Sequence, residues 1–223
     1  MQEQCADIYE FSGIQIVSSF KELTEYEAWK KTPIAVLHRK LCGDFNGLAQ
    51  KFAGWLDIRA EERIQLMLSH QALNNNVCDV FDQIHPKLTD DQILAMEQIL
   101  CDMASTRHFE TVLNIEGERY DPVTKNWHHD DGWKQGRILC AYNTIATEGI
   151  QNSDAEHQKD EFYKRKGEAR IFKINTGDMT RHAVKNTAAD SNPFIHRRPK
   201  SAEDMGPRLL LQSIAGAGWI TLE

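Results

Sequence analysis

The sequence lacks the features that mark secreted, membrane-spanning or disulfide-stabilised proteins. Its five cysteines are odd in number and widely spaced, so neither a CxxC zinc pair nor a disulfide framework is recognisable. No apolar run approaches the ~20 residues that a membrane helix requires. The first residues, Met1 to Cys5, carry no basic and apolar signal segment. These absences predict a protein of the reducing cytoplasm.

Positive charge is scarce as well. The chain has 26 Lys and Arg against 33 Asp and Glu, a formal net charge of −7. Partners such as nucleic acid or an anionic membrane favour a basic stripe, but the one basic cluster, Arg197–Arg198 with Lys200, is short. We expect neither partner and instead a small-molecule or peptide substrate. Nothing in the sequence indicates an oligomeric state.

The N-terminal part of this chain is expected to support a core rather than to form it. At 223 residues the chain suits one domain, mainly helical over residues 1–108 and β-rich over residues 109–223. Apolar residues recur at helical spacing from Phe45 to Leu56, and Thr89 to Gln92 is a capping box that opens another helix. The other elements expected here are helices over residues 59–73 and 77–84 and β-prone runs over residues 14–17 and 34–37.

Beyond residue 106 the pattern becomes that of β-strands. Apolar and polar residues alternate over residues 111–115, as in a half-buried strand. Short strands after a helical half predict an α+β fold with a curled or closed sheet. The long polar segment 149–167 is interpreted as a mobile lid or surface insertion. Further strands are predicted over residues 137–143, 169–174, 193–196, 208–214 and 219–222.

The stretch richest in chemistry is Trp127–Trp133 (WHHDDGW). Side chains two apart on an extended strand share a face, so His128 lies with Asp130 and His129 with Asp131. Either pair offers one nitrogen and one oxygen to the same metal ion. A second histidine would complete the two-histidine, one-carboxylate set of non-haem iron(II) sites, which leaves coordination positions open. The residues alone leave both registers open.

Two later histidines are candidates for the third ligand. His196 follows the apolar segment Pro193–Ile195, which is expected to enter the core. His182 follows Arg181 in a segment interpreted as a loop. We favour His196 and keep His182 as the alternative.

Arg208 heads the apolar strand RLLLQ. Burying an unpaired guanidinium is costly, so an inward Arg208 implies an anionic partner. Its fork of N–H groups matches a carboxylate in bidentate geometry. The plainer alternative is that Arg208 pairs with Asp178 or Glu203 and that the His-His-Asp-Asp cluster is a solvated turn.

The ordered set His128-x-Asp130, then His196, then Arg208 resembles the motif of iron(II)/2-oxoglutarate oxygenases on a double-stranded β-helix. Arg137 opening a strand that ends in Tyr142 and Asn143 is similar to the prolyl-hydroxylase-like members. Gly177–Asp178, the 196–199 segment and the strand at 208–211 also resemble an uncharacterised bacterial family of that superfamily. The resemblance covers roughly residues 109–222.

The resemblance implies a jelly-roll or cupin-like core and an enzyme that hydroxylates or desaturates an unidentified substrate, with release of succinate and CO2. Iron(II) would be held by His128, Asp130 and His196. This register is favoured over His129 and Asp131 because an apolar or aromatic residue commonly precedes the histidine in the family, and Trp127 precedes His128. The cosubstrate 2-oxoglutarate would be held by Arg208 and Tyr142. Two other functions use the same residues: a zinc-dependent hydrolase, and a cupin-like metal-binding or sensing protein without catalysis.

Overall fold

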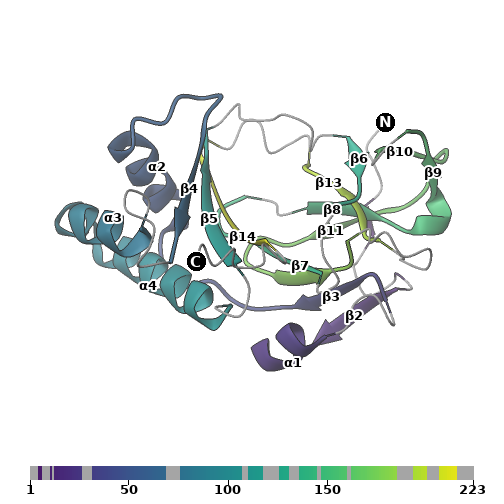
Figure 1. The fold of residues 1–223 in the computed structure, drawn as a ribbon, viewed down its shortest axis with the longest axis horizontal. Helices are drawn as coiled ribbons and strands as arrows, with labels where there is room; N and C mark the ends of the chain where they lie inside the picture. The colour runs from purple at the N-terminus through teal and green to yellow at the C-terminus, as the bar shows by residue number, and fades with distance from the viewer. Residues whose placement is uncertain are drawn as a thin grey trace, which may run out of the picture.

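The strands of the protein form two sheets that lie against each other, with most helices on the outer face of one (Figure 1). The computed structural model describes residues 5–6, 11, 13–26, 32–68, 76–106, 110–117, 126–130, 136–144, 147–159, 162–184, 193–199 and 206–214. Within these residues, no helix is long and apolar enough to span a membrane.

The first sheet has seven strands in the order β1-β11-β8-β13-β6-β10-β9. Neighbours are antiparallel except β1 and β11, which are parallel. Its members are β1 (Cys5–Ala6), β6 (Trp127–His128), β8 (Thr147–Ile150), β9 (Ala155–His157), β10 (Phe162–Arg165), β11 (Ile171–Ile174) and β13 (Ile195–Arg197).

The second sheet also has seven strands, in the order β2-β3-β12-β7-β14-β5-β4. Only β2 and β3 are parallel. The α+β architecture with many strands in two curled sheets is consistent with the predicted jelly-roll-like core. Its members are β2 (Ile14–Val17), β3 (Ile34–Leu37), β4 (Arg63–Met67), β5 (Glu110–Glu116), β7 (Arg137–Ala141), β12 (Met179–His182) and β14 (Arg208–Ile214).

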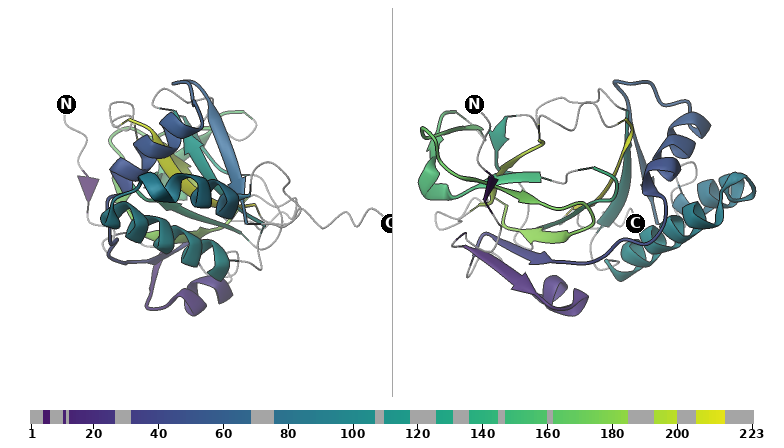
Figure 2. Two further views of the ribbon diagram at one scale, coloured as in Figure 1. Left: turned by 90° about the vertical axis from the view of Figure 1, so that its left-hand side faces the viewer. Right: turned by 180° about the vertical axis from the view of Figure 1, so that it is seen from behind.

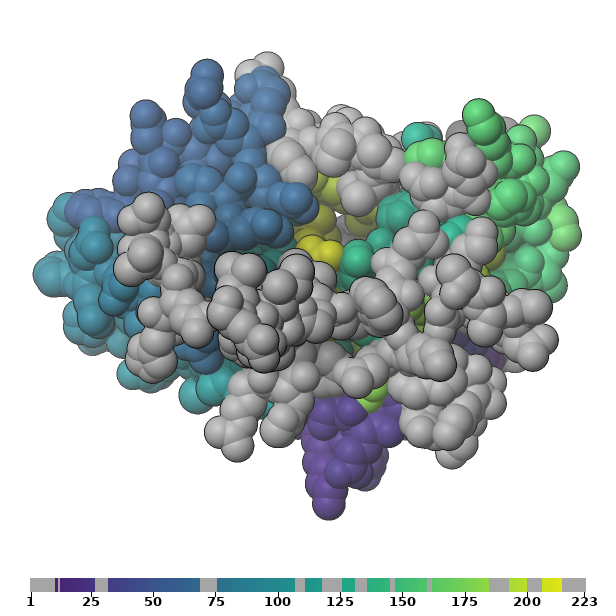
Figure 3. Space-filling view, in the orientation of Figure 1, coloured from purple at the N-terminus to yellow at the C-terminus, as the bar shows by residue number. Residues whose placement is uncertain are grey.

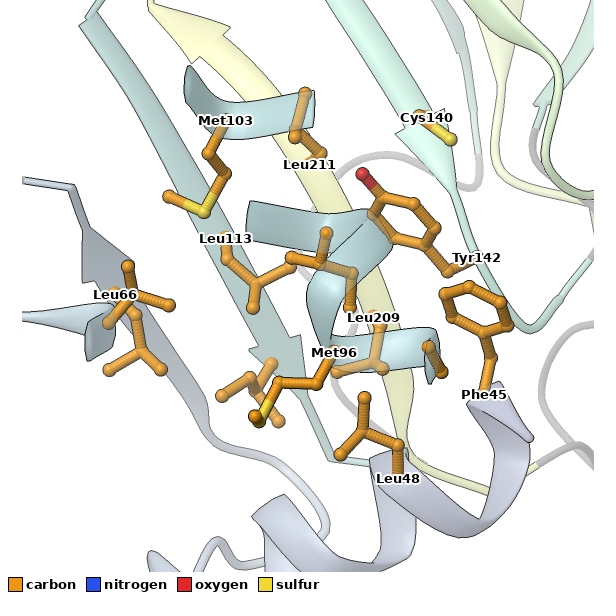
Figure 4. Close-up of a cluster of buried hydrophobic side chains, with 14 of the residues drawn as sticks. Phe45, Leu48, Leu66, Met96, Met103, Leu113, Cys140, Tyr142, Leu209 and Leu211 are labelled. Atoms are coloured by element: carbon orange, nitrogen blue, oxygen red, sulfur yellow. The ribbon is translucent and has the colours of Figure 1, made fainter. Parts of the chain in front are cut away.

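The helices cover the outer face of the second sheet, as two further views show (Figure 2). The capping box is confirmed: the Gln92 amide donates to Thr89 Oγ1 and the Thr89 amide to Gln92 Oε1, at 3.3 and 3.2 Å. Leu48 and Met96 pack against Leu113 and Leu209 of the sheet (Figure 4). The helices are α1 (Phe20–Glu25), α2 (Phe45–Trp55), α3 (Val77–Ile84) and α4 (Asp90–Ser105), with short 3-10 turns η2 (His85–Lys87) and η3 (Asn152–Asp154).

Strand β14 shows how the sequence separates the two faces. Leu209 and Leu211 join the core under the helices, whereas Leu210 joins the core between the sheets. Arg208 and Gln212 share the face of Leu210, because side chains alternate along a strand. The polar side chains of Arg208 and Gln212 therefore point into the interior, toward the first sheet.

Two sequence predictions are wrong. Over residues 59–68 the expected helix is replaced by β4, an edge strand whose Leu66 packs under the helices, and residues 69–73 lie outside the described residues. The alternation of Ile64 and Leu66 with Arg63 and Gln65 outweighs the helical propensity. The segment 149–167, expected to be a loop that forms a mobile lid or surface insertion, instead contains the end of β8, β9 and β10, which belong to the first sheet, and the 3-10 turn η3.

The boundary drawn at residue 108 is not a boundary of the fold. Strands β2, β3 and β4 all come from the N-terminal part and join the second sheet. The β-prone runs at 14–17 and 34–37 are confirmed as β2 and β3. The strand expected at 219–222 lies outside the described residues.

Candidate metal centre

Two neighbouring strands of the first sheet bring the favoured histidines together. His128 on β6 is the cross-strand partner of His196 on β13, and their ring centroids lie 4.5 Å apart. Gly149 on β8 pairs with His196 on its other side. A Cβ at Gly149 would lie 2.2 Å from the buried Phe172 ring, so glycine allows the close packing beside His196.

Asp130 completes a three-residue cluster with these histidines. One ligand atom from each of His128, Asp130 and His196 lies within 4.8 Å of the other two. Nε2 of His128 is 3.9 Å from one carboxylate oxygen, and Nε2 of His196 is 3.6 Å from the other. Both histidines are buried. The donor atoms therefore converge on one point.

Backbone carbonyls fix the orientation of both imidazoles. Nδ1 of His128 donates to the Asn126 carbonyl at 2.8 Å, and Nδ1 of His196 donates to the Phe194 carbonyl at 3.0 Å. A carbonyl oxygen can only accept, so Nδ1 carries a proton, and in the neutral form of either ring the lone pair is on Nε2. Such a bond from the far nitrogen is the usual support of a metal-binding histidine.

Two residues of the second sheet contact the carboxylate of Asp130 and fix its position. Nη1 of Arg137, at the start of β7, lies 2.9 Å from Oδ1 of Asp130. Nε2 of His182, on β12, donates to Oδ2 at 3.0 Å. His182 is fully buried in a strand, so its interpretation as a loop residue is wrong. Its role in the cluster is to contact the carboxylate.

The electrostatics favour the protonation states that metal ligands need. Burial opposes ionisation of Asp130, but His196, the His182 hydrogen bond and Arg137 outweigh it and hold the pKa of Asp130 well below its usual value. Burial, and then the neighbouring His128, lowers the pKa of His196 well below its usual value. Burial also lowers the pKa of His182, against the pull of Asp130. An ionised Asp130 beside a neutral His196 is the state that favours binding of a divalent cation.

The donor set fits iron(II) and also zinc. Two imidazole nitrogens and one carboxylate oxygen are the three-residue set of non-haem iron(II) oxygenases, and the same atoms suit Zn²⁺.

A cavity of about 190 Å³ opens beside the cluster, between the two sheets. Figure 3 shows the yellow atoms of β14 recessed in a hollow of this face. Among the described residues the lining holds five arginines and no aromatic side chain besides the histidines. It consists of Arg63, Glu116, His128, Asp130, Arg137, Leu139, Thr147, His196, Arg197, Arg198, Arg208, Leu210 and Gln212.

Arg208 points into this cavity, as the sequence predicted for an inward arginine. Its side chain is buried, and Nη1 donates to Glu116 Oε2 at 3.3 Å. Burial lowers the pKa of Arg208, an effect that Glu116 opposes and Arg198 reinforces. Within the described residues Arg208 contacts Glu116, whereas Asp178 contacts His38. Glu203, the other expected partner, lies outside the described residues.

Comparison with known proteins adds little to this geometry. No protein-family model matches the chain, and the comparison with curated proteins also gave no match. Among solved structures, the fold is similar to that of a C-terminally truncated thymine 7-hydroxylase from Neurospora crassa in apo form. The TM-score is 0.39, the sequence identity 10%, and the match covers 84% of each chain. A likeness of this degree has no bearing on the activity.

Tyr142 lies on the wrong face for the predicted role in cosubstrate binding. Its ring stacks on Phe45 of α2 under the helices, with centroids 5.3 Å apart (Figure 4). Burial, then the nearby Cys140 and Asp102, raises the pKa of Tyr142 well above its usual value, and its hydroxyl donates to Asp102 of α4 at 2.7 Å. Tyr142 is a structural residue that ties α4 to the sheet.

Of the alternative register, His129 lies among the described residues and Asp131 does not. His129 points away from His128 and contacts the Tyr163 hydroxyl through Nδ1 at 3.1 Å. Within the part of the chain that the structure describes, the cluster forms with His128 and Asp130.

Sequence reasoning missed the residues around the cluster. Arg137 was predicted only as the start of a strand, and Glu116 was given no role in a site. Glu116 could have been found by aligning β5 with β14, since Glu116 is the direct cross-strand partner of Arg208. Arg198 is two residues from His196, so strand alternation places it toward the same side.

Proposed function

We propose that the protein is a non-haem iron(II)- and 2-oxoglutarate-dependent oxygenase whose two curled sheets form a double-stranded β-helix. The observation that supports this most is the combination, in one cavity, of His128, Asp130 and His196 with the buried guanidinium of Arg208. A metal site alone would suit many functions. The guanidinium of Arg208, fixed beside the metal site, suits a ligand that chelates the metal at one end and carries an anionic group at the other.

Each residue has a defined task in this proposal. His128, Asp130 and His196 would hold iron(II) as one face of its coordination sphere. Arg208 would bind the far carboxylate of 2-oxoglutarate. Bound there, the metal and cosubstrate would supply oxidation of the substrate by O2, with succinate and CO2 as coproducts.

The protein's own contribution is orientation and exclusion of water. The carbonyls of Asn126 and Phe194 keep both Nε2 lone pairs toward the cavity, and Arg137 and His182 keep Asp130 ionised and in place. Burial of these groups strengthens their interactions with charge. Because the donors are fixed in this way, they favour one defined ligand geometry.

The test is a turnover assay with a metal analysis. The protein purified without oxygen is loaded with iron(II), given 2-oxoglutarate and O2, and assayed for succinate in the wild type and in Asp130→Ala. The proposal expects iron-dependent succinate in the wild type and none in the variant.

Two results would contradict it. Tight binding of zinc without succinate release, together with ester or amide hydrolysis, would identify a zinc hydrolase. Tight metal binding with neither succinate nor oxygen consumption would identify a metal-binding or sensing protein.

A further inference from the structure

Two buried arginines meet at one carboxylate beside the metal centre. Arg208 on β14 reaches Glu116 Oε2 through Nη1 at 3.3 Å, and Nη1 of Arg198 lies 3.7 Å from the same oxygen. All three side chains are at least nine-tenths buried, and all three line the cavity. Arg198 is two residues after His196, so the two arginines lie next to a predicted metal ligand.

This arrangement has the charge and the donor geometry that suit a small anion. A guanidinium stays protonated in proteins, so two of them in a low-dielectric interior need negative charge nearby. Glu116 supplies such charge from the protein itself, through one oxygen that both arginines contact. A second carboxylate or a phosphate brought to the pair would meet two forked donors of the geometry that binds such groups well.

We propose that Arg198 and Arg208 form a two-guanidinium site for a carboxylate or phosphate group, with Glu116 as the resident counter-ion against which the ligand must compete. Where the ligand is 2-oxoglutarate, the inference rests on the proposed function and adds Arg198 and Glu116 to it. Glu116 stabilises the ligand-free protein and opposes ligand binding, because its charge repels an incoming anion of the same sign.

The experiment is a calorimetric titration of the iron-loaded, oxygen-free protein with three probes. These are 2-oxoglutarate, 2-oxobutanoate, which lacks the second carboxylate, and inorganic phosphate. Glu116→Gln is expected to bind 2-oxoglutarate about tenfold more tightly than the wild type or better, since one unit of repulsion at contact distance is removed. Its affinity for 2-oxobutanoate is expected to stay unchanged.

Arg198→Gln gives an independent test if loss of Glu116 impairs folding. It removes one of the two guanidinium groups, so 2-oxoglutarate should bind roughly tenfold more weakly, as expected for loss of one charge-assisted partner. Asp102→Asn is the matched control: Asp102 is equally buried and paired with Arg39, but belongs to α4 on the other side of the sheet. It should alter stability without altering either affinity.

The outcomes separate this inference from the proposed function. Weaker or unchanged 2-oxoglutarate binding in Glu116→Gln, or unchanged binding in Arg198→Gln, would overturn the inference even if the wild type releases succinate. If the wild type fails to bind 2-oxoglutarate but phosphate binds more tightly in Glu116→Gln, the anion site stands and the cosubstrate is wrong. If no probe binds any variant, both are wrong.

Discussion

Successive side chains of β14 and its neighbouring strands point to opposite faces of the second sheet, and the two faces have different surroundings. The outer face, with Leu113, Cys140 and Leu211, packs under the helices, where even a polar group such as Tyr142 finds a fixed partner. The inner face carries Arg208, Glu116 and Gln212, which line the cavity. One sheet therefore serves as hydrophobic scaffold on one side and as the wall of a charged site on the other.

The contrast also holds between two carboxylates, Asp102, which is buried, and Asp130, which is partly buried. Asp102 pairs with Arg39 and Tyr142 on the helix side, away from the cavity. Asp130 contacts Arg137 and histidines at the edge of the cavity. Each carboxylate contacts an arginine. The two differ in their other neighbours, which are the phenol of Tyr142 for Asp102 and the imidazoles of His128 and His196 for Asp130. Changes on the outer face should alter stability, and changes on the inner face should alter ligand binding.

The largest effect is expected for Asp130→Ala. Loss of the carboxylate removes one of three ligands and should lower iron(II) affinity by more than about 100-fold, since even supporting partners of metal ligands are worth roughly 10–100-fold. Anaerobic titration with iron(II) measures it, with Asp131→Ala as the control. Loss of iron binding in Asp131→Ala but not in Asp130→Ala would reverse the register.

Leu113→Ala probes the opposite face of the sheet. Leu113 is fully buried under the helices, so truncation should lower the free energy of unfolding by about 2–5 kcal/mol through lost burial and a cavity. Denaturant unfolding gives this value. Affinities for iron(II) and 2-oxoglutarate should match the wild type, and a change in either would show that the two faces are not independent.

His182→Ala tests whether the hydrogen bond to Asp130 supports the centre. Iron(II) affinity should fall by roughly 10–100-fold, as for other partners of ligating groups. His182→Gln, whose amide can still donate, should lose less. Equal losses in the two variants would assign His182 to packing alone, and the same anaerobic titration distinguishes these results.

Tyr142→Phe is expected to have the smallest effect. The variant keeps the ring stacked on Phe45 and removes only the hydroxyl bond to Asp102, which should cost about 1–2 kcal/mol in the free energy of unfolding. Thermal and denaturant unfolding measure it. A fall in 2-oxoglutarate affinity without loss of stability would return Tyr142 to the cosubstrate site.

The sequence was most informative where local pattern and tertiary environment agree. The capping box at Thr89 and the apolar strand after Arg208 were predicted correctly, since side-chain periodicity and capping are local properties. The strand at Arg63–Met67 was missed because its residues are good helix formers, and pairing with β5 decides its conformation. The segment after Ile150 looked too polar for a sheet, yet β9 and β10 form an edge that needs few apolar residues.

The same limit applies to the site. His128, Asp130 and His196 were nominated from spacing and resemblance, and the structure brings them together. Tyr142 was misplaced because alternation along a strand tells which residues share a face but not which face is the interior of the site. Spacing could place Tyr142 with Cys140, and only the packing of α2 and α4 shows that both lie on the helix side.

The central claim is that one cavity binds iron(II) through three side chains and a dicarboxylate keto acid through Arg208. Anaerobic titration of the iron-loaded protein with 2-oxoglutarate, followed by visible absorption, tests it directly. The proposal predicts a weak metal-to-ligand charge-transfer band that saturates in the wild type and requires far more 2-oxoglutarate in Arg208→Ala, with iron still bound. No band in the wild type, or an identical titration in Arg208→Ala, would contradict it.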